Sequence, residues 1–145
     1  MSSRRVFTIA EVDALIPELT AIVERQLRRQ SEIEECLAEL ARSCGGLPHA
    51  LEDEAEDTSA VLRMKADLRQ RIAHYEQGWE DVAALGAVLK DPQIGLVDFY
   101  GEIEGRRVWL CWRHGEERLR YYHELSAGFS GRVPLRPETR HRLLN

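Results

Sequence analysis

Two long stretches of the chain repeat apolar residues at alternating spacings of four and three, and this pattern constrains the fold more than any other feature. The first stretch runs from Val12 to Cys44 and the second from Val61 to Leu89. Such heptad spacing, typical of coiled coils, lines apolar side chains along one face of a helix, and that face needs a partner. Because a loop joins the two stretches, the sequence predicts an antiparallel helical hairpin; a dimer that pairs helices between two chains fits the pattern equally.

Local signals mark where the helices begin and end. Thr8 followed by Glu11 forms a capping box, so the first helix should open at Thr8. Pro17 lies too deep for the first helical turn, so it should kink this helix or begin a second one. The pair Gly45-Gly46 should end the helix, and Lys65 is a polar position at which the second apolar stripe is interrupted.

From Gly95 onward the apolar period changes to two, and β-branched and aromatic residues become frequent, which indicates strands. If Glu104-Gly105 is the first turn, Glu102 faces Arg107 and Val97 faces Trp112. Opposite charges and apolar groups then meet across the strands, which supports this register.

The second turn is predicted at His114-Gly115. This placement puts Leu110 opposite Leu119 and Val108 opposite Tyr121, and so gives the sheet one apolar face that the helices can cover. The fold class is therefore α+β, with a helical hairpin packed on a small three-stranded antiparallel meander. The expected parts of this single domain are a helix over 8–44, a helix over 57–90, a sheet over 96–125, and a loop and tail over 126–145 with a helical turn near Thr139.

Composition excludes several classes of protein. A chain of 145 residues with 43% hydrophobic and 31% charged residues can bury one core. No stretch is long and apolar enough to suggest a membrane span, and a formal charge of −5 argues against a nucleic-acid binder. The three cysteines stand at wide, irregular spacings, so we expect free thiols and a cytoplasmic, reducing compartment.

Aromatic residues and arginines are interleaved on the sheet face opposite the predicted core. Binding interfaces select these residue types, because they bury large areas and still form hydrogen bonds. The alternative is a face covered by the loop 128–132 of the same chain. The candidate binding residues on this face, in the neighbouring HEL segment and in the loop are Asp98, Trp109, Arg113, Tyr122, His123, Glu124 and Arg132.

Catalytic and metal-binding readings find less support in the sequence. His123 and Glu124 suggest a general base beside an acid, but neighbours on a strand point to opposite faces, so no catalytic residue is assigned. Cys111 and His114 have the spacing of a metal-ligand pair, yet a structural zinc site needs four ligands. We therefore expect no metal site, and no phosphate-binding loop indicates a cofactor.

Two hypotheses about function follow. The first is a non-enzymatic interaction module that self-associates, as a homodimer, and presents the aromatic and arginine face to a protein partner. The second is a small-anion-binding or enzymatic domain that uses the polar residues of the sheet together with the HEL and GFSGR segments. A pocket that gathers several of these residues would favour the second hypothesis.

Several blocks of sequence, spread over nearly the whole chain, form a recognisable pattern. The blocks are Phe7-Thr8 with Glu11, Ala14-Leu15-Ile16-Pro17-Glu18-Leu19, Lys90-Asp91-Pro92, Gly95-Leu96-Val97-Asp98-Phe99, Leu110-Cys111-Trp112-Arg113, Gly115-Glu116, His123-Glu124-Leu125, Gly128-Phe129, Gly131-Arg132 and Pro134-Leu135. In these blocks the chain resembles an uncharacterised bacterial family, one of the domains of unknown function, whose members are sometimes labelled division initiation proteins. The resemblance implies no established activity. His114 departs from the family pattern, in which an apolar residue is expected.

Overall fold

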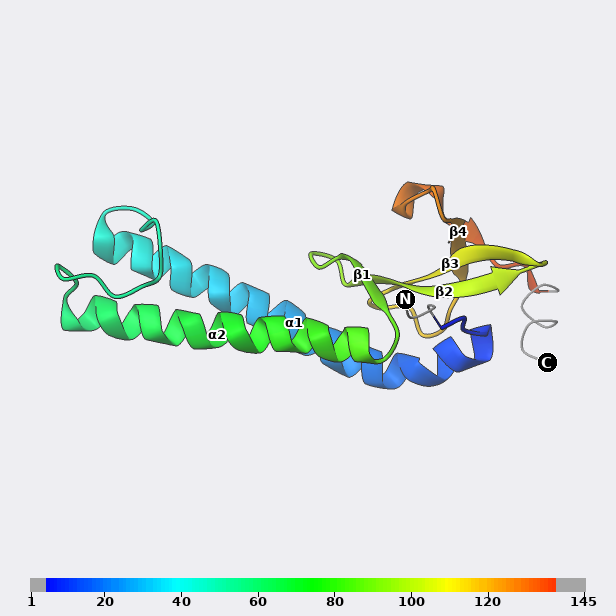
Figure 1. Ribbon diagram of the computed structural model, residues 1–145, viewed down its shortest axis with the longest axis horizontal. Helices are drawn as coiled ribbons and strands as arrows, with labels where there is room; N and C mark the ends of the chain where they lie inside the picture. The colour runs from blue at the N-terminus through cyan, green and yellow to red at the C-terminus, as the bar shows by residue number, and fades with distance from the viewer. Residues whose placement is uncertain (1–4, 138–145) are drawn as a thin grey trace. The chain divides into compact units, whose positions relative to one another are not determined.

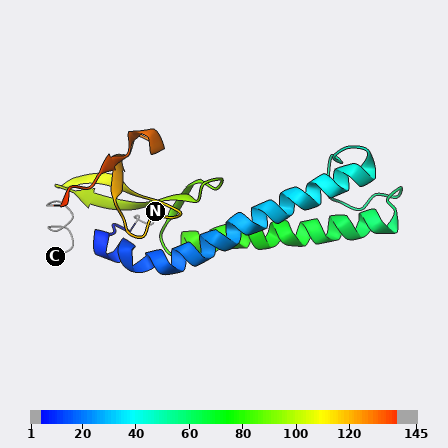
Figure 2. The same ribbon diagram turned by 180° about the vertical axis from the view of Figure 1, so that it is seen from behind.

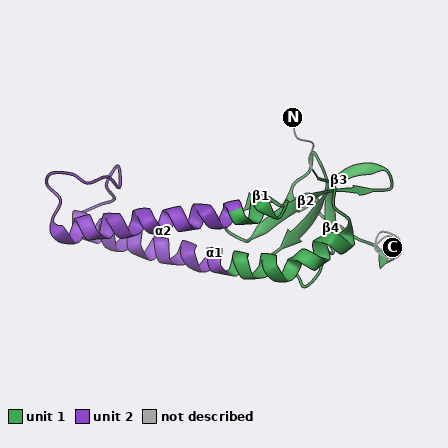
Figure 3. Cartoon of the chain, turned by 60° about the horizontal axis from the view of Figure 1, so that its bottom comes forward, with its two compact units in different colours: residues 1–24, 81–145 green, residues 25–80 purple. Residues whose placement is uncertain are grey.

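The computed structural model describes residues 5–137 (Figure 1). The chain forms two compact units, which are described separately below (Figure 3). One unit, the hairpin unit, comprises Arg25–Glu80. The other, the sheet unit, comprises Met1–Glu24 and Asp81–Asn145. The helical turn predicted near Thr139 lies outside the described residues.

Two long helices account for the heptad-spaced stretches: α1 (Ile9–Cys44) and α2 (Ser59–Ala84). The capping box at the start of α1 is confirmed, because Glu11 N donates to Thr8 Oγ1 at 3.1 Å and Thr8 N donates to Glu11 Oε1 at 2.9 Å. Pro17 lies inside this one continuous helix, so no second helix begins there. The kink at Pro17 stays a prediction.

In the hairpin unit the two helices pair within the chain, side by side (Figure 2). Near one end, Gln26 Nε2 donates to the Tyr75 carbonyl oxygen at 2.6 Å. One to two turns further along α1, Arg71 Nη1 lies 3.0 Å from Glu32 Oε2. As the residue number on α1 rises from 26 to 32, the number of its partner on α2 falls from 75 to 71, so the two helices are antiparallel.

Lys65 continues the apolar stripe of α2 instead of interrupting it. Its side chain is only 1% exposed, and its ammonium donates to the Glu52 carbonyl at 2.9 Å and to Asp57 Oδ2 at 2.8 Å. A buried lysine is tolerated because both acceptors satisfy the charge. Around it, Leu40 and Leu68 are fully buried.

The second helix ends at Ala84, six residues before the predicted end at 90. Gly86 takes φ of +99°, a conformation that an α-helix cannot accommodate and that glycine adopts without strain. A side chain there would also collide with the Phe7 ring, since a Cβ would lie 2.3 Å from Phe7 Cζ. The turn at Gly86 directs residues Val88–Asp91 into a strand, so the prediction of helix in this segment is wrong.

The sheet has five antiparallel strands in sequence order, two more than predicted, and the α+β fold class is confirmed. The additional strands are the first and the last, which lie in segments that the sequence assigned to helix and to loop. A short 3₁₀ helix, η1 (Phe129–Gly131), lies between the last two strands. The strands are β1 (Val88–Asp91), β2 (Leu96–Ile103), β3 (Arg106–Arg113), β4 (Tyr121–Glu124) and β5 (Val133–Pro134).

The predicted register between β2 and β3 is confirmed. Glu102 lies opposite Arg107, and Val97 lies opposite Trp112. The turn between the strands has positive φ at both central residues, 52° at Glu104 and 77° at Gly105. Two successive positive φ values are what a tight hairpin with the natural strand twist requires.

The predicted register between β3 and β4 is wrong. Leu110 lies opposite Tyr122, and Val108 lies opposite Glu124, so β4 is displaced by three residues from its predicted pairing. A displacement by an odd number exchanges the two faces of a strand. As a result Tyr122 and Glu124, predicted on the aromatic and arginine face, lie on the other face, while Tyr121 and His123 take their places.

Contacts of the loop between β3 and β4 explain the displacement. The Trp112 indole donates to the Glu116 carbonyl at 2.8 Å, which extends the turn beyond His114-Gly115. Leu119 is fully buried, and its backbone N donates to Asp13 Oδ1 on α1 at 2.8 Å. Because the backbone N–H of Leu119 is bound to Asp13, Leu119 does not pair with β3, and β4 begins at Tyr121.

The core of the sheet unit lies between the first part of α1 and one face of the sheet. Phe7 packs edge-on against Phe99, with ring centroids 5.0 Å apart. The fully buried residues here include Val12, Leu19, Val23, Val97, Phe99, Val108 and Trp112. The opposite face of the sheet carries the polar residues considered next.

Candidate functional site

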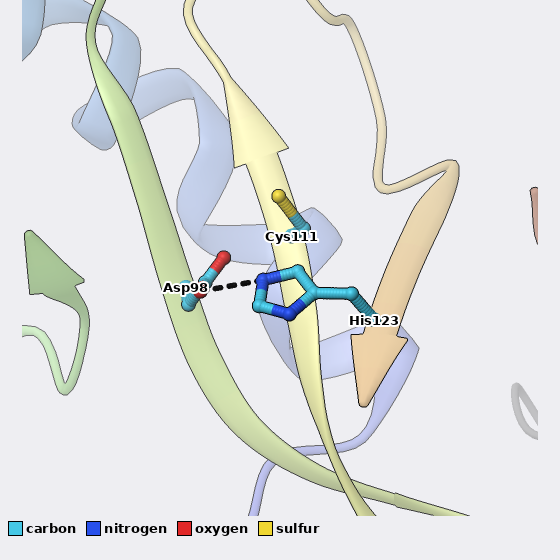
Figure 4. A group of neighbouring side chains, drawn as sticks. All are labelled: Asp98, Cys111 and His123. Atoms are coloured by element: carbon cyan, nitrogen blue, oxygen red, sulfur yellow. Dashed lines mark hydrogen bonds and ion pairs between the residues drawn. The ribbon is translucent and has the colours of Figure 1, made fainter. Parts of the chain in front are cut away.

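One face of the sheet brings ionisable side chains from three neighbouring strands together. Asp98 on β2 lies opposite Cys111 on β3, and Trp109 on β3 lies opposite His123 on β4. Cross-strand partners share a face of the sheet. The displaced register of β4 is therefore what places His123 beside Asp98 and Cys111 (Figure 4).

Asp98, Cys111 and His123 form a compact buried cluster. A carboxylate oxygen, the sulfur and a ring nitrogen all lie within 4.8 Å of one another. His123 Nε2 is 2.8 Å from Asp98 Oδ2 (Figure 4). Asp98 and Cys111 are 0% exposed and His123 is 2% exposed, so these polar groups have been removed from water almost completely. Burial of this kind is costly unless every group is paired.

The second ring nitrogen of His123 fixes the orientation of the imidazole. Nδ1 lies 3.0 Å from the carbonyl oxygen of Glu124, to which it donates its hydrogen. Nε2 then points at Asp98, and in the neutral ring it carries a lone pair toward a carboxylate oxygen. Two acceptors can approach to 2.8 Å only with a positive centre between them, which is either a proton or a metal ion. A histidine anchored through Nδ1 to a backbone carbonyl is the usual arrangement of a metal ligand.

Asp98 has unused bonding capacity. Its Oδ1 atom is buried and has no hydrogen-bond partner among the described residues. An unpaired buried carboxylate oxygen is unfavourable, because it has lost its hydration without replacement. Beyond the Cys111 thiol, whose hydrogen bond to the Asp98 carboxylate helps to raise its own pKa, no donor or cation of the described residues reaches this oxygen.

Cys111 is held as a thiol. Burial, reinforced by the neighbouring Asp98 carboxylate, raises the pKa of Cys111 to about 12. The thiolate is the reactive form of cysteine, so this residue is not a nucleophile at neutral pH. A metal ion, by contrast, displaces the thiol proton when it binds.

A pocket of about 300 Å³ borders the cluster at Asp98 and His123. Cys111 does not line it. The pocket combines charged residues of the strands with small and apolar residues, of which Leu96 lies on β2 and the others at or just before η1. Its lining consists of Lys90, Asp91, Leu96, Asp98, His123, Ala127, Gly128 and Phe129.

Trp109, one of the candidate residues of the predicted binding face, is covered and only 7% exposed. Its ring packs on Tyr100 at 5.5 Å between centroids. The ammonium group of Lys90 lies 4.1 Å from the Trp109 ring centroid and 4.0 Å from Asp98 Oδ2. Lys90 thus links Trp109 to the charged cluster.

The other predicted residues lie apart from the cluster. Tyr122 and Glu124 lie on the opposite face of β4, where Glu124 forms an ion pair with Arg106 at 2.9 Å. Arg113 is exposed at the end of β3, with its guanidinium 5.8 Å from the Phe129 ring.

Arg132 lies next to the cluster without joining it. Its Nη2 donates to Glu116 Oε1 at 2.6 Å and to the Cys111 carbonyl oxygen at 3.3 Å. Its guanidinium also stacks on Tyr121 at 4.0 Å and lies 5.0 Å from the Phe129 ring centroid. These contacts tie the segment after β4 to β3.

Sequence reasoning missed Cys111 and Lys90 as site residues. The pair considered at sequence level, Cys111 with His114, does not meet, because His114 Nε2 lies 3.4 Å from Glu24 on α1. The confirmed register of β2 and β3 already makes Asp98 and Cys111 cross-strand partners, and this signal could have been used. Lys90 gave no such signal, since it was assigned to a helix end.

Comparison with known proteins adds a family but no activity. No curated protein and no solved structure matches the chain. Among residues 5–137, no helix is long and apolar enough to cross a membrane. A family model described as an uncharacterized conserved protein (DUF2203) matches residues 5–135. The match covers more than half of the chain, which therefore belongs to the DUF2203 family of uncharacterised conserved proteins.

Proposed function

We propose that the sheet unit binds one divalent transition-metal ion, with zinc as the preferred ion, through Asp98, Cys111 and His123. The observation that carries this proposal is the convergence of three buried ligand atoms within 4.8 Å, one of them on a carboxylate whose second oxygen has no partner. The anchoring of His123 through Nδ1 supports it independently.

The donor set selects the kind of ion. Magnesium and calcium prefer sites made of oxygen alone, whereas a thiolate, an imidazole and a carboxylate together suit zinc. A tetrahedral zinc site holds its ligand atoms about 3.5 Å apart. The three donors would therefore adjust by about 1 Å, which side-chain rotation on adjacent strands can supply.

Charge balance also supports a bound cation. A divalent ion satisfies the Asp98 carboxylate and replaces the proton of the Cys111 thiol. Lys90 alone cannot do so, because its ammonium lies 4.0 Å from Asp98 Oδ2, beyond hydrogen-bond distance. The site requires a reduced cysteine, which agrees with the cytoplasmic localisation predicted from the sequence.

The number of ligands indicates a site with an open position. No fourth side chain of ligand type joins the cluster within the part of the chain that the structure describes. Structural zinc sites have four protein ligands, whereas sites that bind or activate another molecule have three. We therefore assign the site to ligand binding rather than to stabilisation of the fold.

The hypothesis of an exposed interaction face receives less support than the pocket. Trp109 was one of its candidate binding residues, and this side chain is packed inside the unit. Self-association as a homodimer stays a prediction. It does not depend on the metal site and is tested separately.

Cobalt substitution tests the metal proposal directly. The full chain is purified with reductant, stripped with a chelator and titrated with Co²⁺, and absorption is recorded in the near-ultraviolet and visible regions. We expect one ion per chain, a thiolate-to-cobalt charge-transfer band, and displacement of cobalt by zinc. Cys111→Ser should abolish the band, and His123→Gln should weaken binding by more than about 100-fold, the upper range for loss of an outer-shell group.

A cysteine elsewhere in the chain serves as the matched control. Cys44 is exposed at the end of α1, so Cys44→Ser should leave the cobalt spectrum unchanged. Circular dichroism of each variant establishes that it is folded. No charge-transfer band in the parent protein, or a band that survives in Cys111→Ser, would refute the proposal.

A further inference from the structure

We infer that the metal site takes a small organic carboxylate as its fourth ligand, and that Lys90 holds the second carboxylate oxygen. This inference rests on the proposed metal site and names the class of molecule that the site receives. Three features carry it: the position of the pocket, the placement of Lys90 and the apolar part of the pocket wall.

The pocket borders two of the three proposed metal ligands. Asp98 and His123 line it, whereas Cys111 does not, so the cluster is approached from the side of these two residues. A volume of about 300 Å³ is at the lower end for ligand pockets and suits a molecule of few atoms. An ion held by the three side chains would present its open position toward this space.

Lys90 is placed beside this position by an irregularity in the sheet. The ladder between β1 and β2 pairs Leu89 with Val97 and then Asp91 with Leu96, so Lys90 is the bulged residue. Bulges re-aim a side chain and occur beside functional sites. Here the side chain extends over the Trp109 ring, which holds the ammonium at 4.1 Å.

A bound ion and Lys90 would face the pocket as two positive groups. The Lys90 ammonium lies 4.0 Å from Asp98 Oδ2, beyond hydrogen-bond distance, and its side chain is 35% exposed, so it is available to an anion. The ammonium and the ion would together form a two-point site for one carboxylate. Asp91, also in the lining, opposes a second negative charge, which favours a monoanion.

The remaining wall favours an organic anion over an inorganic one. Leu96, Ala127 and Phe129 also line the pocket, and Phe129 is 41% exposed. An apolar substituent on the ligand's carboxylate would cover the Phe129 ring. The removal of both apolar surfaces from water would strengthen binding. Gly128 adds no side chain, so the substituent has space.

The test uses the cobalt-loaded full chain, with benzoate, acetate and inorganic phosphate as probes. Addition of benzoate should shift the visible cobalt bands saturably, and acetate should do so more weakly because it lacks the apolar part. Lys90→Met keeps most of the side-chain volume and should raise the dissociation constant for benzoate at least about tenfold, the effect of losing one charged hydrogen bond. Asp91→Asn should leave benzoate binding equal or tighter.

The two proposals fail in different ways. A charge-transfer band that does not respond to benzoate refutes the inference and leaves the metal proposal standing. Absence of the band refutes both. Benzoate binding that is unchanged in Lys90→Met, or a stronger response to phosphate than to benzoate, also overturns the inference. Retention of the charge-transfer band in Lys90→Met shows that the variant is folded and loaded.

Discussion

Trp109→Ala separates a covered sheet face from an exposed one. The side chain is 7% exposed and packs between Tyr100 and Lys90, so its removal leaves a cavity. Truncation of a buried tryptophan to alanine costs about 3 to 5 kcal/mol, and loss of the cation–π contact with Lys90 adds about 0.5 to 1 kcal/mol. Because small domains have a free energy of unfolding of about 5 to 15 kcal/mol, the variant should still fold but should lose a large part of this free energy.

The free energy of unfolding of the sheet unit is measured by urea titration, with the intensities of the backbone amide NMR signals of β2 and β3 as the probe. These signals report on the sheet unit alone. Trp112→Ala serves as the core reference, because Trp112 is fully buried and its indole is hydrogen bonded. Leu125→Ala serves as the surface reference, because Leu125 is 46% exposed and should change the free energy of unfolding by less than about 0.5 kcal/mol. A loss below about 1 kcal/mol for Trp109→Ala, with a large loss for Trp112→Ala, would refute the packing argument and restore the interaction face.

Three further predictions concern the hairpin unit and the association of the chain. Leu68→Ala should destabilise the hairpin by about 2 to 5 kcal/mol in urea melts, because Leu68 is fully buried; a loss below about 0.5 kcal/mol would mean that it is a surface residue. The hydrogen bond from Lys65 lowers the pKa of Asp57 below its usual 3.8, so the stabilising effect of this pair is present above that pH and is lost as the pH falls further. Asp57→Asn should therefore lower the melting temperature at neutral pH and flatten the acid part of the stability profile, whereas an unchanged profile would contradict this assignment. Sedimentation over micromolar concentrations should show a homodimer, and a monomer mass throughout would remove the prediction of self-association.

The sequence was a good guide wherever the structure is decided by neighbours along the chain. The capping box at Thr8 involves only the next three residues, and the hairpin between β2 and β3 closes over two residues with the left-handed backbone that Glu104-Gly105 adopts. The heptad stripes likewise predicted that the two helices pair along one apolar face each, either as an antiparallel hairpin or between two chains. The structure decides for pairing within the chain. The stripes could not decide that Lys65 is buried, because its acceptors are supplied by the preceding loop.

Seven residues in or near the site were named as candidates from the sequence, but the sequence did not bring the three members of the cluster together. Asp98 and His123 were among the seven, but the wrong assumption that β4 follows a two-residue turn placed Tyr122 and Glu124 on the face of Asp98, and His123 on the other face. The length of that turn depends on Leu119, whose backbone is bound by Asp13 more than a hundred residues earlier in the chain.

The sequence by itself thus determined the α+β class, the two helices, the capped start of α1 and the pairing of β2 with β3, because periodicity and turn chemistry act over a few residues. Only the tertiary structure decided where α2 ends, since Gly86 turns the chain beneath Phe7, and which face of β4 meets β3. A one-residue difference in a strand exchanges its faces, so a contact between Leu119 and α1 determines whether His123 or Glu124 lies beside Asp98 and Cys111. The candidate metal site exists because that long-range contact is made.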